Sequence, residues 1–99
     1  MSKIALVTGA TSGIGKATAQ ILAKNNYKII LCGRREDRLL EIKNELSAFT
    51  EVQTLSFDVR DKKAVFDSIN SLPEQFSKID VLINNAGNAP GLVPILSGN

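Results

Sequence analysis

The chain has 99 residues, which is enough for one domain and no more. Hydrophobic residues make up 43% of it and charged residues 22%, which is close to ordinary globular usage and argues against disorder, a collagen-like repeat or a disulfide scaffold. The formal net charge is only +2 and the basic residues are scattered, so the composition gives no sign of nucleic-acid binding. With one cysteine and no apolar run near the roughly 20 residues of a membrane span, we expect a cytoplasmic protein with no membrane partner.

The first third of the chain predicts two strands joined by a helix. Ile4 to Val7 form a short, unbroken apolar run, which is typical of a strand buried on both faces. From Gly13 onwards apolar residues recur at helical spacing, and Tyr27 to Cys32 form a second apolar run that Gly33 stops. The apolar residues of the helical segment are Ile14, Ala17, Ile21 and Leu22.

The rest of the chain repeats this alternation. A second amphipathic helix is predicted from about Glu36, and Val52 to Phe57 predict a third strand. Asp61 can cap a third helix, in which Pro73 marks a break or restart, and Val81 to Ile83 predict a fourth strand. The apolar residues are Leu39, Ile42, Leu46 and Phe49 for the second helix, and Val65, Ile69, Leu72 and Phe76 for the third.

Four strands therefore alternate with three helices, and the connections are too short for anything but crossover helices. Alternation of this kind gives a parallel sheet that is covered on both faces. The sequence predicts the α/β class, with residues 1–99 forming one unit.

A glycine-rich turn joins the first strand to the first helix. It is Thr-Gly-Ala-Thr-Ser-Gly-Ile-Gly, from Thr8 to Gly15. Its glycines can permit a tight turn, let the backbone approach a phosphate and let the helix pack closely on the strand. The helix start then offers free N–H groups and a positive dipole end to an anion. The alternative is a plain glycine-rich connection, whereas a Walker-type loop is excluded because no Lys-Ser/Thr pair follows Gly15.

The end of the second strand predicts which dinucleotide would bind. Dinucleotide folds usually place an acidic residue there, where it bonds the adenine-ribose hydroxyls. This chain has Arg34 and Arg35 instead, and guanidinium groups bind phosphate through a bidentate fork. We therefore expect NADP(H) rather than NAD(H). The alternative is that both arginines begin a solvated helix and pair with Glu36 and Asp37.

Taken together, these motifs resemble the N-terminal, cofactor-binding half of the short-chain dehydrogenase/reductase family. Residues Thr8 to Gly15 match the family's cofactor turn, Asp58-Val59 match its adenine-binding Asp, and Asn84 to Gly87 match its Asn-Asn-Ala-Gly motif. The resemblance implies a Rossmann-type, doubly wound parallel sheet, here truncated to about four strands in the order 3-2-1-4 with three helices. It is strongest to the branch of NADP-dependent serine and 3-hydroxy acid dehydrogenases.

The resemblance also implies a role for each matching residue. The pyrophosphate would be held by Gly9, Ala10, Thr11, Ser12, Gly13, Ile14 and Gly15, the 2′-phosphate by Arg34 and Arg35, the adenine by Asp58 and Val59, and the nicotinamide-side ribose by Asn85 with Ala86 and Gly87. Two alternatives remain open. Asp58 could be a solvated cap near the third helix, and the two asparagines could form a polar turn.

The family's catalytic residues have no counterpart in this sequence. The only tyrosine, Tyr27, is followed four residues later by Leu31 rather than by the lysine of the family's Tyr-x-x-x-Lys pair. The chain has no histidine and a single cysteine, so we assign neither a catalytic residue nor a metal site. Cys32 is expected to be a buried strand residue. Glu41 and Glu45 are expected to lie on a solvated helix face.

The leading hypothesis is an NADP(H)-dependent oxidoreductase that interconverts a hydroxyl and a carbonyl by hydride transfer. The resemblance implies small 3-hydroxy acid substrates such as serine or allo-threonine, and a complete enzyme that forms a homotetramer. The apolar fourth strand would be an exposed edge, so we expect these residues to be the beginning of a longer protein. The alternatives are a stand-alone, non-catalytic NADP(H)-binding module and an inactive fragment that associates through this strand.

Overall fold

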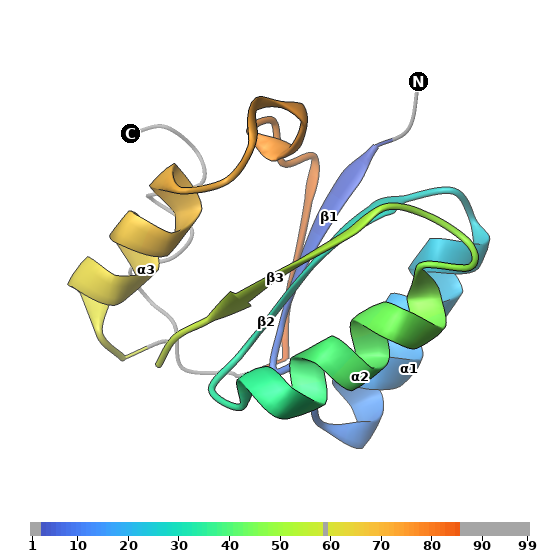
Figure 1. Cartoon of the computed structure of the whole chain (residues 1–99), viewed down its shortest axis with the longest axis horizontal. Helices are drawn as coiled ribbons and strands as arrows, with labels where there is room; N and C mark the ends of the chain where they lie inside the picture. Colours follow the sequence, from blue (N-terminus) through green and yellow to red (C-terminus); the bar gives the residue numbers. More distant parts are fainter. Residues whose placement is uncertain (1–2, 59, 86–99) are drawn as a thin grey trace.

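The computed structural model describes residues 3–58 and 60–85 and has four parallel strands with helices on both sides of the sheet (Figure 1). In chain order the elements are β1 (Ile4–Thr8), α1 (Gly13–Lys24), β2 (Lys28–Gly33), α2 (Glu36–Leu46), β3 (Val52–Ser56), α3 (Lys62–Asn70), the short 3₁₀ helix η1 (Glu74–Phe76) and β4 (Val81–Asn84). The strand order is β3-β2-β1-β4, so the predicted fold class and the order 3-2-1-4 are confirmed. None of the described helices is long and apolar enough to cross a membrane.

The central strand β1 fixes the register of the sheet. Leu6 lies opposite Ile30 of β2 on one side and opposite Leu82 of β4 on the other. Asp80 joins the start of β4 to the start of β1. Its carboxylate accepts a hydrogen bond from the Ile4 N–H at 2.9 Å, and its own N–H donates to the Ile4 carbonyl at 2.8 Å. All four strands end at the same edge of the sheet, where parallel α/β sheets bind their ligands.

Alternate residues of the strands build two separate apolar cores. Ala5 and Val7 face α1 and α2, whereas Ile4 and Leu6 face α3 and η1. The two central strands, β1 and β2, are thus buried on both faces, which explains why their sequences are continuous apolar runs, whereas β3 and β4 are only partly buried. Cys32 lies in the core on the α3 side and is fully buried, as predicted.

Helix α1 contacts the sheet through its smallest residues. Gly15, Ala19 and Ala23 are its buried positions, while Ile14 is 74% exposed and Ile21 is 63% exposed. Small side chains let the helix axis approach the strands closely, so Ile14 and Ile21 point away from the sheet, while Leu22 is partly buried against the core. The helix was predicted at the right place, but two of its three large apolar residues do not contribute to its buried face.

The ends of α2 and α3 show one error and one confirmation. Phe49 was assigned to the buried face of the second helix, but α2 ends at Leu46 and the Phe49 ring is 53% exposed, with Lys24 Nζ at 5.9 Å from its centroid. Asp61 caps α3 as predicted, since its Oδ1 accepts the Ala64 N–H at 3.1 Å. Pro73 also marks a restart, because η1 begins directly after it and buries Phe76.

Candidate functional site

The glycine turn is held in shape by the Ser12 hydroxyl. Ser12 Oγ donates to the Gly9 carbonyl at 2.8 Å and accepts the Gly15 N–H at 3.1 Å, which makes it the N-cap of α1. Gly9 adopts a positive φ of 60°, which favours glycine. A Cβ on Gly15 would collide with the Gly9 carbonyl oxygen and lie 2.8 Å from its carbon. These two glycines are therefore required by the turn itself.

Gly13 differs from the other two, because a Cβ there would meet nothing within 4 Å. Within residues 3–58 and 60–85, neither the Gly13 N–H nor the Ile14 N–H has a hydrogen-bond acceptor. Both belong to the first turn of α1, where backbone donors and the helix dipole attract an anion. The turn thus presents unpaired donors beside a glycine whose face is open, which fits a pyrophosphate group.

The turn is attached directly to the end of β2. The Ala10 N–H donates to the Cys32 carbonyl at 3.1 Å, and Thr11 Cγ2 lies 3.6 Å from the position of a Cβ on Gly33. Arg34 and Arg35 follow Gly33 in the chain. The predicted neighbours, the glycine turn and the arginine pair, are therefore brought together at one edge of the sheet.

The two arginines have different surroundings. Arg35 Nη2 lies 3.8 Å from Asp37 Oδ2, so part of the alternative interpretation, pairing within a solvated helix start, is present. Both side chains of this pair are mostly exposed, and such pairs contribute little to stability. Arg34 has no carboxylate within ion-pair distance in the described part of the chain. Its carbonyl accepts a 3.3 Å hydrogen bond from Ser56 Oγ at the end of β3.

Asp58 follows β3 and is already engaged by Arg60. Arg60 Nε donates to Oδ1 at 3.1 Å, Arg60 Nη2 donates to Oδ2 at 2.9 Å, and the Arg60 N–H donates to Oδ1 at 2.9 Å. These bonds from Arg60, with a weaker contribution from the charge of Arg34, lower the pKa of Asp58 from 3.8 to about 2. The cap of α3 is Asp61, not Asp58. Val59, predicted to bind adenine, lies outside the described residues.

The asparagine pair follows β4, next to the end of β1. The buried Thr8 hydroxyl lies 3.0 Å from Asn84 Oδ1 and 3.4 Å from the Ile83 carbonyl, so it links these strand ends. The Asn85 Nδ2 atom is buried and has no hydrogen-bond partner among residues 3–58 and 60–85. An orphaned amide donor at this edge fits a site that a ligand oxygen completes. Ala86 and Gly87, which were predicted with Asn85, lie outside the described residues.

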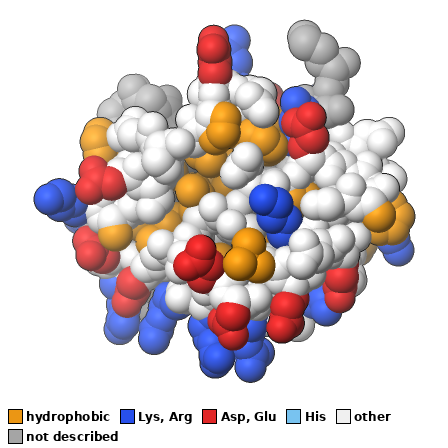
Figure 2. Space-filling view, in the orientation of Figure 1, with side chains coloured by type: hydrophobic (Ala, Val, Ile, Leu, Met, Phe, Trp, Pro, Cys, Tyr) orange, Lys and Arg blue, Asp and Glu red, His pale blue; other side chains and the backbone are white. Residues whose placement is uncertain are grey.

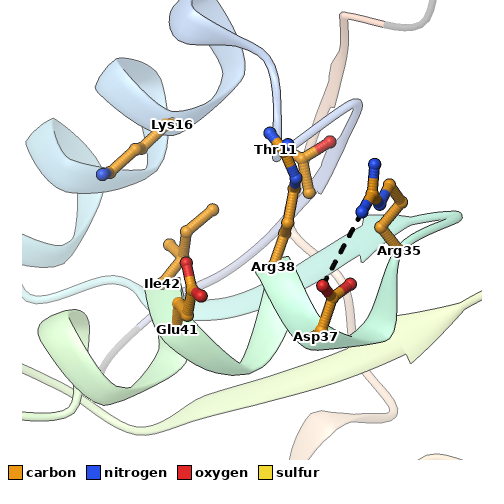
Figure 3. A pocket seen from close by; sticks show the side chains of 7 residues that line it. All are labelled: Thr11, Lys16, Arg35, Asp37, Arg38, Glu41 and Ile42. Carbon is orange, nitrogen blue, oxygen red and sulfur yellow. Dashed lines mark ion pairs between the residues drawn. The ribbon is translucent and has the colours of Figure 1, made fainter.

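A cavity beside the turn contains residues that the sequence did not single out. It has a volume of about 430 Å³ and lies between the glycine turn, α1 and the start of α2 (Figure 3). Its polar and charged lining consists of Thr11, Lys16, Arg35, Asp37, Arg38 and Glu41. The missed residues are Lys16 and Arg38. The available signal for Arg38 was that a further basic residue follows the N-cap residue Arg35 in the first turn of α2.

Residues 3–97 match the short chain dehydrogenase family. The chain belongs to this family. It is 52% identical to sulfoacetaldehyde reductase 2 of Chromohalobacter salexigens, over 90% of this chain and 35% of that protein. It is also 47% identical to serine 3-dehydrogenase of Rhizobium radiobacter, over 95% of this chain and 37% of that protein.

Solved structures of short chain dehydrogenases share the fold. L-Sorbose reductase from Gluconobacter frateurii, complexed with NADPH and L-sorbose, matches with a TM-score of 0.80 and 37% identity, over 88% of this chain and 34% of that one. Serine dehydrogenase from Escherichia coli matches with a TM-score of 0.71 and 38% identity, over 80% of this chain and 36% of that one. The predicted resemblance to serine and 3-hydroxy acid dehydrogenases is confirmed. The chain spans about a third of the length of these relatives.

Proposed function

We propose that this chain is the cofactor-binding portion of an NADP(H)-dependent oxidoreductase that interconverts a hydroxyl and a carbonyl. The observation that carries the proposal is that the glycine turn and the arginine pair lie next to each other at one edge of the sheet. The unpaired N–H groups of Gly13 and Ile14 lie in a turn that the Ala10–Cys32 hydrogen bond holds against the end of β2. Two guanidinium groups, and no carboxylate, follow directly where β2 ends.

Each part of a dinucleotide has a matching group in this arrangement. The turn from Gly9 to Gly15 would bind the pyrophosphate through its backbone donors. Asp58 would accept a hydrogen bond from the adenine amino group, and its low pKa keeps the carboxylate ionised at neutral pH. The buried Asn85 amide would find its missing acceptor on the nicotinamide-side ribose. When bound, NADP(H) supplies the hydride chemistry, and these residues position it.

Arg34 and Arg35 would select NADP(H) over NAD(H). A phosphate at the ribose 2′ position gains charge-assisted hydrogen bonds from guanidinium groups, whereas a carboxylate at the end of β2 would repel it. The relatives support this choice of cofactor. One is named as an NADP-dependent 3-hydroxy acid dehydrogenase of Escherichia coli, and the L-sorbose reductase structure contains NADPH.

Small 3-hydroxy acids such as serine or allo-threonine are the proposed substrate class, and the support comes from the names of the relatives alone. The 99 residues contain no Tyr-x-x-x-Lys pair, so we propose that the acid/base step belongs to residues of a longer enzyme. We further propose that this enzyme is cytoplasmic and tetrameric. An intact mass of the protein from its natural source tests whether the enzyme is longer than this chain: a mass well over twice 10.7 kDa agrees with that, and a mass near 10.7 kDa leaves only a nucleotide-binding module or an inactive fragment.

The cofactor assignment is tested by Arg34→Asp. We expect this change to weaken NADPH binding by tenfold or more, roughly the loss of one charge-assisted hydrogen bond, with NADH affinity little changed or improved. Titration calorimetry with both nucleotides measures the ratio. Lys78→Asp is the matched control, because Lys78 is exposed and precedes β4 at the opposite edge of the sheet. An unchanged ratio of NADPH to NADH affinity in Arg34→Asp would show that the cofactor assignment is wrong.

A further inference from the structure

The cavity beside the glycine turn contains a guanidinium group that no predicted role uses. Arg38 lies on α2, whereas Arg35 is the extended N-cap residue just before this helix, and both residues line the cavity. Figure 3 shows the Arg38 side chain extended towards Thr11 of the turn, at the same end of the cavity as Arg35. The three residues therefore surround one end of the cavity, next to the proposed pyrophosphate site.

The charges around this cavity are unequally neutralised. Arg35 shares its charge with Asp37 at 3.8 Å, and Lys16 pairs with Glu45 at 3.6 Å, towards the other end of the cavity. Arg38 has no carboxylate within ion-pair distance among residues 3–58 and 60–85. Glu41 is placed three residues later, where a helical pair could form, but its carboxylate is not within ion-pair distance of Arg38. Arg38 thus presents an uncompensated positive charge to the cavity.

Basic and acidic groups are mixed on the molecular surface. In Figure 2, Lys and Arg side chains extend along the lower left and the lower edge, with carboxylates among them. Because both signs are mixed there, a general positive field does not explain anion binding. Recognition would instead depend on which individual cation is unpaired and faces the ligand.

We propose that Arg38 binds the 2′-phosphate of NADP(H) together with Arg35 and is a specificity-determining residue. The inference rests on the proposed function and adds a residue to it. A phosphate monoester has a charge of about −1.5 to −2 at neutral pH, so one partly neutralised guanidinium leaves it undercompensated. Arg34 would contact the same phosphate from outside the cavity, because it is not among the residues that line it. Arg38 therefore supplies the second full charge on the side of the cavity.

The test compares nucleotides that differ only in this phosphate. NADPH, NADH and adenosine 2′,5′-bisphosphate are titrated into the full chain and into Arg38→Gln, Arg38→Lys and Lys78→Gln. We expect Arg38→Gln to weaken NADPH and the bisphosphate by roughly tenfold, the loss of one charge-assisted hydrogen bond, while NADH affinity stays within twofold. Arg38→Lys should be intermediate, because it keeps the charge and loses the fork. High salt should reduce the difference between wild type and Arg38→Gln.

Each other outcome overturns the inference in a distinct way. If Arg38→Gln keeps the wild-type ratio of NADPH to NADH affinity, Arg38 does not contact the phosphate and the proposed function still stands on Arg34 and Arg35. If NADPH and NADH weaken equally, the substitution acts on the structure, which a change in the circular dichroism spectrum or in the thermal unfolding of the whole chain would report. If Lys78→Gln has the same effect, only net charge matters. If the wild type does not prefer NADPH, the proposed function fails, and this inference fails with it.

Discussion

Arg60 binds both carboxylate oxygens of Asp58, with Nε 3.1 Å from Oδ1 and Nη2 2.9 Å from Oδ2. The fork lowers the pKa of Asp58 to about 2, so the carboxylate at the carboxyl end of β3 stays ionised in weakly acidic as well as neutral solution. It also gives the carboxylate a fixed orientation, although both side chains are at the surface. If Asp58 accepts a hydrogen bond from the adenine amino group, Arg60 is a positioning residue that acts through Asp58.

Removing this fork should change the titration of Asp58. In Arg60→Gln we expect the Asp58 pKa to rise from about 2 towards its ordinary value of 3.8, because the charged donor and the fork are lost. A lowered carboxyl pKa stabilises the fold above pH 4, and that contribution is lost as the pH falls towards 2. Carbon-13 NMR of the Asp58 carboxyl over this range measures the shift. Equal pKa values in Arg60→Gln and wild type would contradict the role of the fork, and Lys63→Gln is the control for charge alone.

Two glycines of the turn should respond oppositely to the same added methyl group. Gly15→Ala places a Cβ against the Gly9 carbonyl, so we expect a loss of about 1–3 kcal/mol or more in the free energy of unfolding. Gly13→Ala meets no atom within 4 Å and should leave the fold as stable as the wild type or slightly more so. Thermal unfolding followed by circular dichroism compares the two variants.

Gly13→Ala also separates binding from folding. The new methyl group would occupy the open face beside the unpaired Gly13 and Ile14 N–H groups, where we propose that the pyrophosphate binds. We therefore expect weaker binding of both NADPH and NADH, by roughly tenfold, at unchanged stability. Equal nucleotide affinity in Gly13→Ala and wild type would mean that the pyrophosphate does not approach this face.

The sequence predicted the strands and the turn well because each has a local cause. A strand buried on both faces must be continuously apolar, and the Thr8–Gly15 turn needs glycine at Gly9 and Gly15 for reasons that lie within the turn. The buried face of α1 was not predictable in the same way. Ile14 and Ile21 have helical spacing and large apolar side chains, yet the distance between helix and sheet favours Gly15, Ala19 and Ala23 as the contacts.

The candidate site likewise has one part that the sequence predicts and another part that it does not. The position of Arg34, Arg35 and Asp58 at one edge of the sheet could be predicted, because they follow the ends of neighbouring parallel strands; their role in binding stays a prediction. The Asp58–Arg60 fork and the direction of Arg38 depend on side-chain conformations, which no periodicity encodes. Arg38 belongs to α2, where a basic residue in a helix is ordinarily a solvated one. Its contribution is visible only after the turn and α2 are placed side by side.

The link between β1 and β4 should have a measurable cost. Thr8→Val keeps the shape of the buried side chain but removes the hydroxyl that lies 3.0 Å from Asn84 Oδ1. We expect a loss of roughly 1 kcal/mol in the free energy of unfolding, the usual net value of one hydrogen bond. Denaturant unfolding measures this, and faster amide exchange at Ile83 should accompany it. Thr8→Ser, which keeps the hydroxyl, is the control for the methyl group. If Thr8→Val is as stable as the wild type, the Thr8 hydroxyl does not contribute to stability.

Cys32 offers a direct test of whether the two cores form in this chain. Cys32 belongs to β2, and its thiol is fully buried in the core on the α3 side of the sheet. This burial raises the pKa of the thiol well above its usual range. Because only the thiolate reacts readily, a thiol reagent at pH 8 should label native protein at the rate of unfolding or local opening and label protein in concentrated urea at once. Mass spectrometry at timed intervals measures both rates. Adding NADPH should slow native labelling further, since a ligand that binds only the folded state stabilises it. Immediate labelling without denaturant would show that the 99 residues alone do not form a core that protects Cys32.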